Sequence, residues 1–238
     1  MRMSGVRTLL MGGQACVYYG AAEFSRDLDL LVLADENNLL VLRHALDELE
    51  AQTIAVPQFR ADFLERGHAI HFRCHRDDVK DLRIDVMSKL RGTDSFDRLW
   101  SRRTTIEVDG IEVDMLALPD LVIAKKTQRD KDWPMIRRLV EQSYFSLSEA
   151  PTDERLEFLF LELRTAELLM ALASEHHQAA QRAAARRSAV RAALEGSAED
   201  VWVALALEEA AERETDRIYW KPLKAELEHL RRSRSKPD

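Results

Sequence analysis

The sequence predicts an α/β fold of the α+β type, in which a mixed β-sheet with flanking helices is followed by a C-terminal helical bundle. Short apolar runs of strand length alternate with helical patterns as far as residue 145, which is typical of a layered domain of sheet and helices. No strand pattern follows residue 150. The residues between, at 143–153, are rich in serine, as linkers are. We therefore expect two domains, at residues 1–145 and 150–232.

The first domain begins with short strands and helices in alternation. Apolar residues at 6–11 predict a strand that ends at Gly12 and Gly13, and leucines on one side predict a helix at 36–51. The expected elements of this part are a strand at 6–11, a helix at 14–19, a strand at 28–33, a helix at 36–51, paired strands at 69–74 and 82–87, and a helix at 95–102.

A hairpin and two helices complete the first domain. Apolar and polar side chains alternate over residues 104–115 on both sides of Asp109-Gly110, a dipeptide that favours a two-residue hairpin turn. Pro119 and Pro134 indicate helix starts, because proline suits the first helical turn. These helices are expected at 120–127 and 134–140.

The second domain is expected to consist of helices alone. Thr152 or Asp153 is a suitable N-cap for the first of them, and Gly196-Ser197 separates the second from the third. The predicted helices lie at 154–176, 178–194, 199–214 and 217–230, followed by a frayed tail at 231–238.

The composition excludes several classes of protein. The 238 residues carry a formal net charge of −7, which argues against a general nucleic-acid-binding coat, since that depends on many lysine and arginine contacts with phosphate. No apolar run approaches the roughly 20 residues that span a bilayer, so no membrane association is expected. Two cysteines are too few for a disulfide framework, and the first strand begins too early for a signal peptide. We expect a cytoplasmic protein.

Two carboxylates on one strand are the strongest chemical signal. Asp27 and Asp29 are two residues apart, so in a strand they share a face and lie roughly 7 Å from each other. Oxygen ligands of this kind suit Mg²⁺ or Mn²⁺, which bind few carboxylates together with substrate phosphates. Gly12 and Gly13 have no side chains, so their backbone can approach a phosphate closely. The combination points to metal-assisted nucleotidyl transfer.

Gly12-Gly13, a gap of thirteen residues and Asp27-x-Asp29 together resemble the signature of the DNA polymerase β-like nucleotidyltransferase superfamily. The likeness is greatest to its small bacterial members, the AbiEii-type toxins and minimal nucleotidyltransferases. The resemblance implies a two-metal transfer of a nucleoside monophosphate from an NTP to a hydroxyl acceptor. The family often has serine as the second residue of the glycine pair, so Gly13 removes a hydroxyl contact with phosphate.

A third carboxylate is expected on a neighbouring strand. Asp85 lies between apolar residues of the strand at 82–87, and its side chain must face solvent or a polar cleft. The resemblance to the nucleotidyltransferase superfamily implies that Asp85 ligates the catalytic metal and helps to deprotonate the nucleophile. Asp114 is the rival, since it also lies in an alternating strand. We favour Asp85.

Further nucleotide contacts are expected from Ser25 and from a basic segment. Ser25 precedes Asp27 at the mouth of the expected site. Lys125, Lys126 and Arg129 lie in a segment that resembles the family's second diagnostic region, and cations there would offset the charge of a triphosphate. The alternative is that these three residues only form a solvated helix end.

Two other clusters are weaker candidates. His68, His71, Cys74 and His75 suggest zinc, but their spacing along a strand does not let three of them converge. Arg182, Arg186, Arg187 and Arg191 are the best candidates for a basic patch, although a solvated helix face is the favoured interpretation.

The leading hypothesis is therefore an enzyme with an NTP substrate, Mg²⁺ or Mn²⁺ at Asp27, Asp29 and Asp85, and a hydroxyl acceptor in tRNA, another RNA or a small molecule. The resemblance to AbiEii-type proteins also implies a toxin with an antitoxin protein as partner. The alternatives are an antibiotic-type nucleotidyltransferase, a catalytically silent binding or regulatory module with the same fold, and a helical interaction protein.

Overall fold

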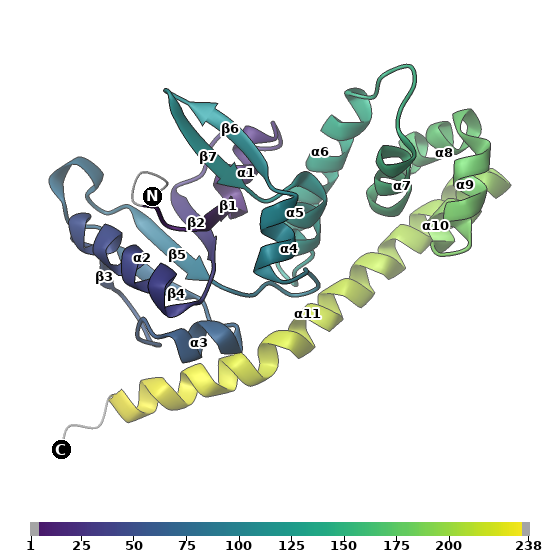
Figure 1. Cartoon of the computed structure of the whole chain (residues 1–238). Coiled ribbons are helices and arrows are strands. Elements are labelled where there is room, and N and C mark those ends of the chain that lie inside the picture. Colours follow the sequence, from purple (N-terminus) through teal and green to yellow (C-terminus); the bar gives the residue numbers. More distant parts are fainter. Residues whose placement is uncertain (1–4, 235–238) are drawn as a thin grey trace. The chain divides into compact units, whose positions relative to one another are not determined.

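A computed structural model describes residues 5–234 of the chain, and a seven-stranded mixed sheet is its central feature (Figure 1). The strand order is β3-β4-β5-β2-β1-β7-β6. The strands are β1 (Thr8–Met11), β2 (Asp27–Val32), β3 (Gln52–Thr53), β4 (Ile70–Arg73), β5 (Arg83–Met87), β6 (Thr104–Val108) and β7 (Ile111–Met115). The predicted mixed sheet with flanking helices is confirmed.

Parallel and antiparallel pairs alternate around β2, the central strand. β2 runs antiparallel to β1 and parallel to β5, whereas β4 and β5 form the antiparallel pair that was predicted. Leu9, Leu31 and Ile84 of the three middle strands are almost fully buried. The sheet centre is therefore held by aliphatic packing, and the polar residues of β2 and β5 lie near one end of this core.

The helices around the sheet are α1 (Gly12–Tyr18), α2 (Glu36–Glu48), α3 (Ala61–Arg66), α4 (Phe96–Ser101) and α5 (Leu118–Lys125), with a 3₁₀ turn at Asp77–Val79. In α2 the Asp35 side chain accepts a hydrogen bond from the Asn38 amide, 2.9 Å away, and so caps the helix. Gly12 and Gly13 form the first turn of α1 and do not merely end β1, which corrects the predicted helix start at residue 14.

Two short elements were not predicted. α3 has six residues, of which only Phe63 and Leu64 are buried, and β3 has two exposed residues. Neither is long enough to show the periodicity on which sequence patterns depend. The hairpin of β6 and β7 is as predicted, because Asp109 and Gly110 both adopt positive φ, +51° and +75°, as a two-residue hairpin turn requires.

Both proline-led helices begin before their prolines. Pro119 is the second residue of α5, and Pro134 is the third residue of α6 (Asp132–Phe145), positions at which the missing amide proton costs no helical hydrogen bond. α6 continues to Phe145, so the first three residues of the serine-rich segment at 143–153 are helical. The prediction of a helix that ends at Val140 was wrong, since Ser143 is buried.

The C-terminal part is helical, as predicted, but its helices are divided differently. They are α7 (Asp153–Glu162), α8 (Ala166–Glu175), α9 (His177–Ala184), α10 (Ser188–Glu195) and α11 (Ala198–Arg234). Two predicted helices are each split. Thr165 is extended between α7 and α8, and Arg187 is extended between α9 and α10. Arg187 is buried and donates to the carbonyls of Phe160 and Leu163, which holds the chain in this break.

One continuous helix, α11, replaces the two helices predicted at 199–214 and 217–230. The Thr215 hydroxyl bonds back to the Ala211 carbonyl, and the buried Asp216 carboxylate accepts the Gln128 amide at 2.9 Å, so the polar residues at 215–216 do not break the helix. Pro222 lies inside it. Residues 231–234 of the predicted frayed tail are helical, and 235–238 lie outside the described residues.

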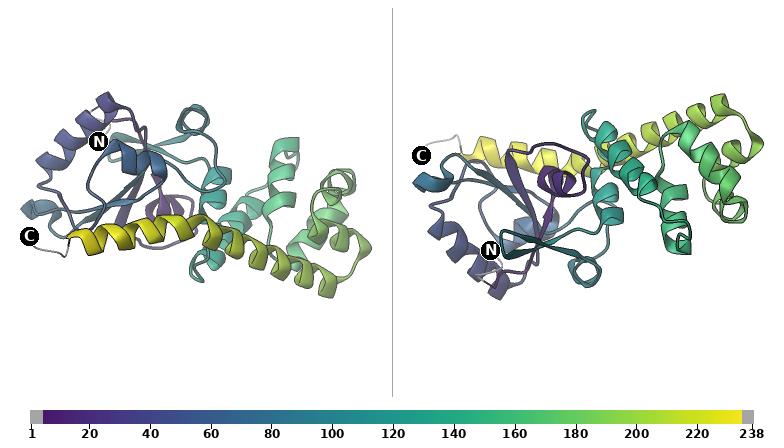
Figure 2. Two further views of the ribbon diagram at one scale, coloured as in Figure 1. Left: turned by 90° about the horizontal axis from the view of Figure 1, so that it is seen from below. Right: turned by 90° about the horizontal axis from the view of Figure 1, so that it is seen from above.

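The described chain divides into two compact units. The first runs to Ala124 and takes in α11 from Ile218 onward; the second covers Lys125–Arg217. The division predicted from sequence, at 1–145 and 150–232, remains a prediction. Within the first unit, the last turns of α11 lie alongside α3 (Figure 2). Across residues 5–234, no helix is both long and apolar enough to cross a membrane.

Candidate acidic site on the sheet

Three aspartates meet on one face of two parallel strands. In the register of β2 and β5, Asp29 lies opposite Asp85 and Asp27 lies opposite Arg83. Because side chains alternate along a strand, Asp27, Asp29, Arg83 and Asp85 all project from the same face. The three carboxylates are partly buried. We call Asp27, Asp29, Arg83 and Asp85 the acidic face.

The glycine turn between β1 and α1 is fitted to the Asp29 carboxylate. Met11 pairs with Asp29 across the sheet, and the Gly13 amide donates to Asp29 Oδ2 at 3.3 Å. A Cβ atom at Gly12 would lie 1.9 Å from the same oxygen, and Gly12 has a φ of +67°. Both facts require glycine, because real Cβ atoms do not approach so closely and other residues avoid this φ. The turn therefore fixes the carboxylate beside the partly buried backbone of Gly12 and Gly13.

Ser25 fills the space beside the second glycine. A Cβ at Gly13 would lie 2.3 Å from Ser25 Oγ, while Gln14 Nε2 donates to the Ser25 carbonyl at 2.8 Å. The Ser25 hydroxyl also donates to the Asp27 carbonyl at 3.4 Å. The space that a side chain at position 13 would fill is therefore occupied by the Ser25 hydroxyl, which comes from the loop before β2. The predicted loss of a phosphate contact through Gly13 stays a prediction.

The Asp85 carboxylate is held by two neighbours. His71 Nδ1 lies 2.8 Å from Oδ1, and Arg83 donates from Nε to Oδ1 at 2.8 Å and from Nη2 to Oδ2 at 3.0 Å. His71 stands opposite Asp85 on β4. Burial raises the pKa of the Asp85 carboxyl, but hydrogen bonds and charge from His71 and Arg83 outweigh it and hold this pKa below its ordinary value. Asp85 is therefore ionised at neutral pH.

Arg83 is the cation of the acidic face. Hydrogen bonds to Asp85 raise the pKa of Arg83, against the effect of burial, and the charges of Asp85, Asp27 and Asp29 raise it further. One guanidinium therefore faces three carboxylates, which leaves the face negative. Arg83 was not predicted from sequence, and His71 was considered only as a zinc ligand. The available signal was spacing, since Arg83 shares a face with Asp85 in any strand.

Asp114, the rival third carboxylate, lies elsewhere. It is buried on β7, accepts hydrogen bonds from Arg103 Nε at 2.8 Å and from the Thr105 hydroxyl at 2.5 Å, and belongs to a strand that does not pair with β2. Of the two candidates, only Asp85 stands in register with Asp29.

The donor set suits a divalent cation in part. Two carboxylates beside a glycine turn match the way Mg²⁺ binds, with the remaining ligands supplied by water and substrate phosphates. Both Asp85 oxygens already accept hydrogen bonds from Arg83, and ligation of a metal by Asp85 stays a prediction. Throughout residues 5–234, no group of three or more His, Cys, Asp and Glu side chains could by itself hold a metal ion. His68 bonds to Glu226 at 2.8 Å and does not join His71 or Cys74.

The predicted phosphate-binding cations belong to the second unit, and each has a carboxylate partner there. Lys126 Nζ lies 2.8 Å from Glu162 Oε1. Lys125 Nζ and Arg129 Nε approach the two oxygens of Asp132, at 3.4 and 2.7 Å. Both lysine side chains are largely buried, whereas Arg129 is 55% exposed.

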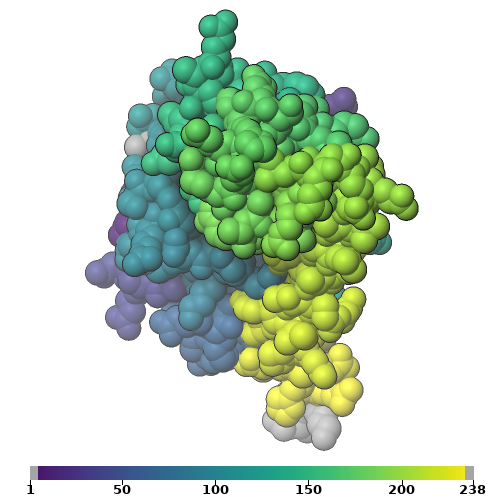
Figure 3. Space-filling view, turned by 90° about the vertical axis from the view of Figure 1, so that its right-hand side faces the viewer, coloured from purple at the N-terminus to yellow at the C-terminus, as the bar shows by residue number. Residues whose placement is uncertain are grey.

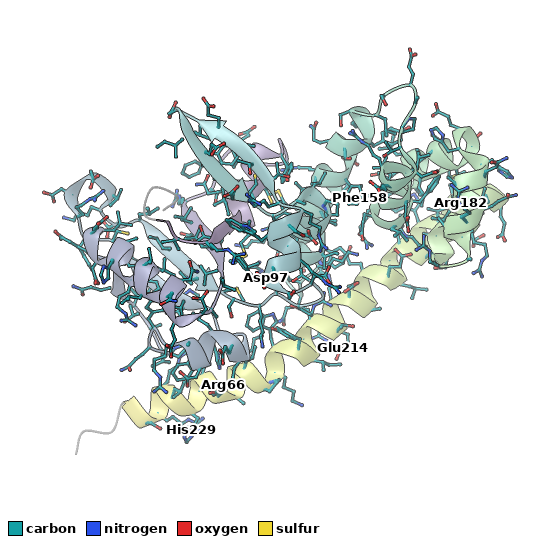
Figure 4. All side chains as sticks on the ribbon, in the orientation of Figure 1. Arg66, Asp97, Phe158, Arg182, Glu214 and His229 are labelled. Carbon is teal, nitrogen blue, oxygen red and sulfur yellow. The ribbon has the colours of Figure 1, made fainter. Side chains whose placement is uncertain are left out.

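The arginine-rich segment forms no open basic patch. Arg182 of α9, labelled in Figure 4, pairs with Asp153 of α7 at 3.0 Å, and Arg186, in the turn after α9, pairs with Glu157 of α7 at 2.7 Å. All four residues line a groove of about 270 Å³. Arg187 is buried against Glu208. The favoured interpretation of a solvated face holds for Arg182 and Arg186 and was wrong for Arg187.

No protein-family model matches the chain, and no curated protein matches it. Among solved structures, the chain is similar to an antigenic nucleotidyltransferase-like protein from Paracoccidioides brasiliensis, at 15% identity, over 80% of this chain and 85% of that one, with a TM-score of 0.38. A likeness of this degree says nothing about activity.

Proposed function

We propose that the chain binds a nucleoside triphosphate together with Mg²⁺ or Mn²⁺ at the acidic face, and transfers the nucleoside monophosphate to a hydroxyl acceptor. The observation that carries the proposal is the parallel register of β2 and β5, which sets Asp29 beside Asp85 while the glycine turn contacts Asp29. Three carboxylates with one guanidinium among them, beside bare backbone, are costly to assemble unless a cation and an anionic ligand use them.

In this proposal Asp27 and Asp29 hold the divalent ion, which when bound supplies positive charge to the triphosphate. The phosphates would bind beside the backbone of Gly12 and Gly13, and the Ser25 hydroxyl would donate to one of their oxygens. Asp85 accepts the proton of the acceptor hydroxyl. The acceptor oxygen forms a bond to the α-phosphorus as the bond to pyrophosphate breaks, so pyrophosphate carries away the leaving electron pair.

The predicted phosphate contacts Lys125, Lys126 and Arg129 belong to the second unit, and their role stays a prediction. Lys126 is buried with Glu162 and Lys125 with Asp132, so moving either would leave a buried carboxylate without its cation. Arg129 is more than half exposed, but it too bonds to the buried Asp132.

A catalytically silent nucleotide-binding module is the second candidate. The hydrogen bonds of Asp85 with Arg83 and His71 favour it, since they occupy the oxygens that a general base needs. Both candidates bind a nucleotide, but only the transferase converts it to product.

The test is transfer of label from α-³²P-labelled NTPs with Mg²⁺, using total tRNA in one arm and a hydroxyl-rich aminoglycoside in the other. Asp29→Asn and Asp85→Asn are compared with Asp47→Asn, which changes an exposed carboxylate on α2. The transferase proposal predicts labelled acceptor from the wild type and Asp47→Asn, and a loss of about 100-fold or more in the site variants. Transfer that survives Asp29→Asn contradicts the site.

A toxin role can be tested in the same variants. Growth arrest when the chain is expressed alone in a bacterium, relieved by Asp29→Asn but not by Asp47→Asn, would support a toxin whose partner is an antitoxin. Unimpaired growth with active wild-type enzyme would contradict that role and leave the transferase proposal standing.

A further inference from the structure

The polar side of the sheet that carries the acidic face continues beyond β5 onto β4. Two rows of side chains in register cross the sheet there. The first row, from β1 to β4, is Met11, Asp29, Asp85 and His71, and the second, from β2 to β4, is Asp27, Arg83 and Arg73. Because residues two apart in a strand share a face, His71 and Arg73 project from the same side as the three aspartates. This side of the sheet therefore changes from carboxylates on β2 to basic side chains on β4.

Arg73 and Arg83 lie directly opposite each other on the antiparallel strands β4 and β5. Like charges in such positions destabilise a strand pair unless other groups compensate them. Arg83 is compensated by its two hydrogen bonds to Asp85. Within residues 5–234, the ion-pair partner of Arg73 is Asp81, whose carboxylate is 3.6 Å away and 69% exposed. Arg73 is itself 44% exposed, so it can turn to another anion and leave Asp81 in water at little cost.

β4 is held in place where it begins. His68, two residues before Ile70, bonds to Glu226 of α11 at 2.8 Å, and a Cβ atom at Gly67 would lie 2.8 Å from Tyr219 Oη. Figure 3 shows the last turns of α11, in yellow, at the surface beside the blue residues of α3. The side chains of β4 are therefore presented on a fixed strand, which lowers the entropic cost of binding a ligand.

We propose that Arg73 binds a phosphate group of the acceptor, in a subsite next to Asp85. The inference rests on the proposed function, which places the NTP phosphates beside Gly12 and Gly13 and the acceptor hydroxyl at Asp85. The remainder of the acceptor then lies on the other side of Asp85 from the glycine turn, over β4. Arg73 and Asp85 are diagonal neighbours across the strand pair, roughly 7–8 Å apart. One sugar phosphate can reach both residues.

The charge of β4 narrows the class of acceptor. A guanidinium forms strong, charge-assisted hydrogen bonds with phosphate oxygens. Arg73 and Arg83 would repel a polycationic acceptor such as an aminoglycoside. An RNA backbone and a small phosphorylated sugar both carry the required group, so the experiment includes a probe of each kind.

Binding of acceptor probes in the absence of NTP tests the subsite without turnover. The probes are a fluorescein-labelled single-stranded RNA of about 12 nucleotides, measured by anisotropy, and ribose 5-phosphate, measured by isothermal titration with ribose as the phosphate-free control. We expect Arg73→Gln to raise the Kd for the RNA or for ribose 5-phosphate about tenfold or more. The probe that responds identifies the source of the phosphate. Arg98→Gln is the matched control, because Arg98 of α4 is also exposed and also lies 3.6 Å from an aspartate.

Asp81→Asn separates a phosphate contact from a structural ion pair. Asp81 has a φ of +66°, a conformation that asparagine also tolerates. The change releases Arg73, so the Kd for the responding probe should stay the same or fall about twofold. If Arg73 served only to hold Asp81, this variant would weaken binding as Arg73→Gln does. Far-UV circular dichroism checks that each variant is folded.

The outcomes separate this inference from the proposed function. No binding of either phosphate probe by the wild type, an unchanged Kd in Arg73→Gln, an equal effect of Arg98→Gln, or weaker binding by Asp81→Asn would each overturn the subsite. Titration of the wild type with Mg²⁺ and a non-hydrolysable ATP analogue tests the proposed function by itself. Probe binding that depends on Arg73, in a chain that binds no nucleotide, would contradict the proposed function and leave the phosphate subsite standing.

Discussion

Gly12 and Gly13 each leave room for a neighbouring side chain of the candidate site. The sequence analysis predicted that the glycines matter because backbone must approach a phosphate. The structure adds a cause that requires no ligand, since Asp29 occupies the space beside Gly12 and Ser25 occupies the space beside Gly13. A spacing motif could point to these positions, but the contacts themselves come from three-dimensional packing.

Gly12→Ala should lower the free energy of unfolding by about 3 kcal/mol, of which about 1 kcal/mol is backbone strain at positive φ and the rest is the clash with Asp29. Gly110→Ala is the control, because its φ of +75° is similar but nothing lies within 4 Å of the new Cβ. It should cost about 1 kcal/mol. Urea denaturation of both variants measures the difference. Equal losses would show that Asp29 is not fixed against Gly12.

Gly13→Ser should destabilise the chain by about 2 kcal/mol, because its Cβ would lie 2.3 Å from Ser25 Oγ. Ser25→Gly removes the obstructing side chain. The double variant should therefore recover stability relative to the sum of the two single changes, and a double-mutant cycle of melting temperatures or urea midpoints measures this coupling. Additive effects would mean that Ser25 does not occupy this space.

At the scale of elements, the turn between α5 and α6 is organised by Asp132. Its carboxylate is almost fully buried and accepts hydrogen bonds from the Thr127 hydroxyl at 2.5 Å and from Arg129 Nε at 2.7 Å, with Lys125 Nζ at 3.4 Å. The sequence analysis selected Lys125 and Arg129 as cations and left Asp132 without a role. Its burial depends on how α6 packs, which a charge pattern does not reveal.

Asp132→Asn should destabilise the chain by about 2 kcal/mol at pH 7. Burial raises the pKa of Asp132, but Lys125, Thr127 and Arg129 outweigh it and hold the pKa below its unfolded value. The stabilisation is therefore full above the unfolded pKa of about 4 and is lost as the pH falls through the lower, folded pKa. Urea midpoints from pH 7 to pH 2.5 should show the two proteins converging. Asp130→Asn is the control, because Asp130 lies in the same turn but is exposed, and it should change the urea midpoint little. A difference in urea midpoint between the wild type and Asp132→Asn that persists at pH 2.5 would contradict this account.

The last turns of α11 make contacts that local sequence patterns could not predict. Glu226 bonds to His68 at 2.8 Å and to Arg66 at 2.9 Å, so these turns of α11 are fixed to α3, as Figure 4 shows at Arg66. Hydrogen bonds from His68 lower the pKa of Glu226, burial opposes this, and the charges of His68 and Arg66 lower it further. These partners are about 160 residues apart in sequence, which no local pattern can detect.

At the scale of the whole molecule, the sequence predicted the mixed sheet and six of its seven strands, because alternation and glycine turns are local signals. The partners of Asp85 could not be predicted in this way. His71 reaches Asp85 only through the pairing of β4 with β5. The break between α9 and α10 at Arg187 could not be predicted either, because it depends on the burial of the Arg187 guanidinium. Both depend on packing between elements.

The central claim is that Asp27, Asp29 and the glycine turn form a metal–nucleotide site. Isothermal titration of the full chain with Mg²⁺ and a non-hydrolysable ATP analogue tests it most directly, with Asp29→Asn and Asp47→Asn as the variant and its control. We predict saturable binding by the wild type and Asp47→Asn, weakened about tenfold or more by Asp29→Asn or by omission of Mg²⁺. Equal binding by Asp29→Asn, or no binding by the wild type, would contradict the claim.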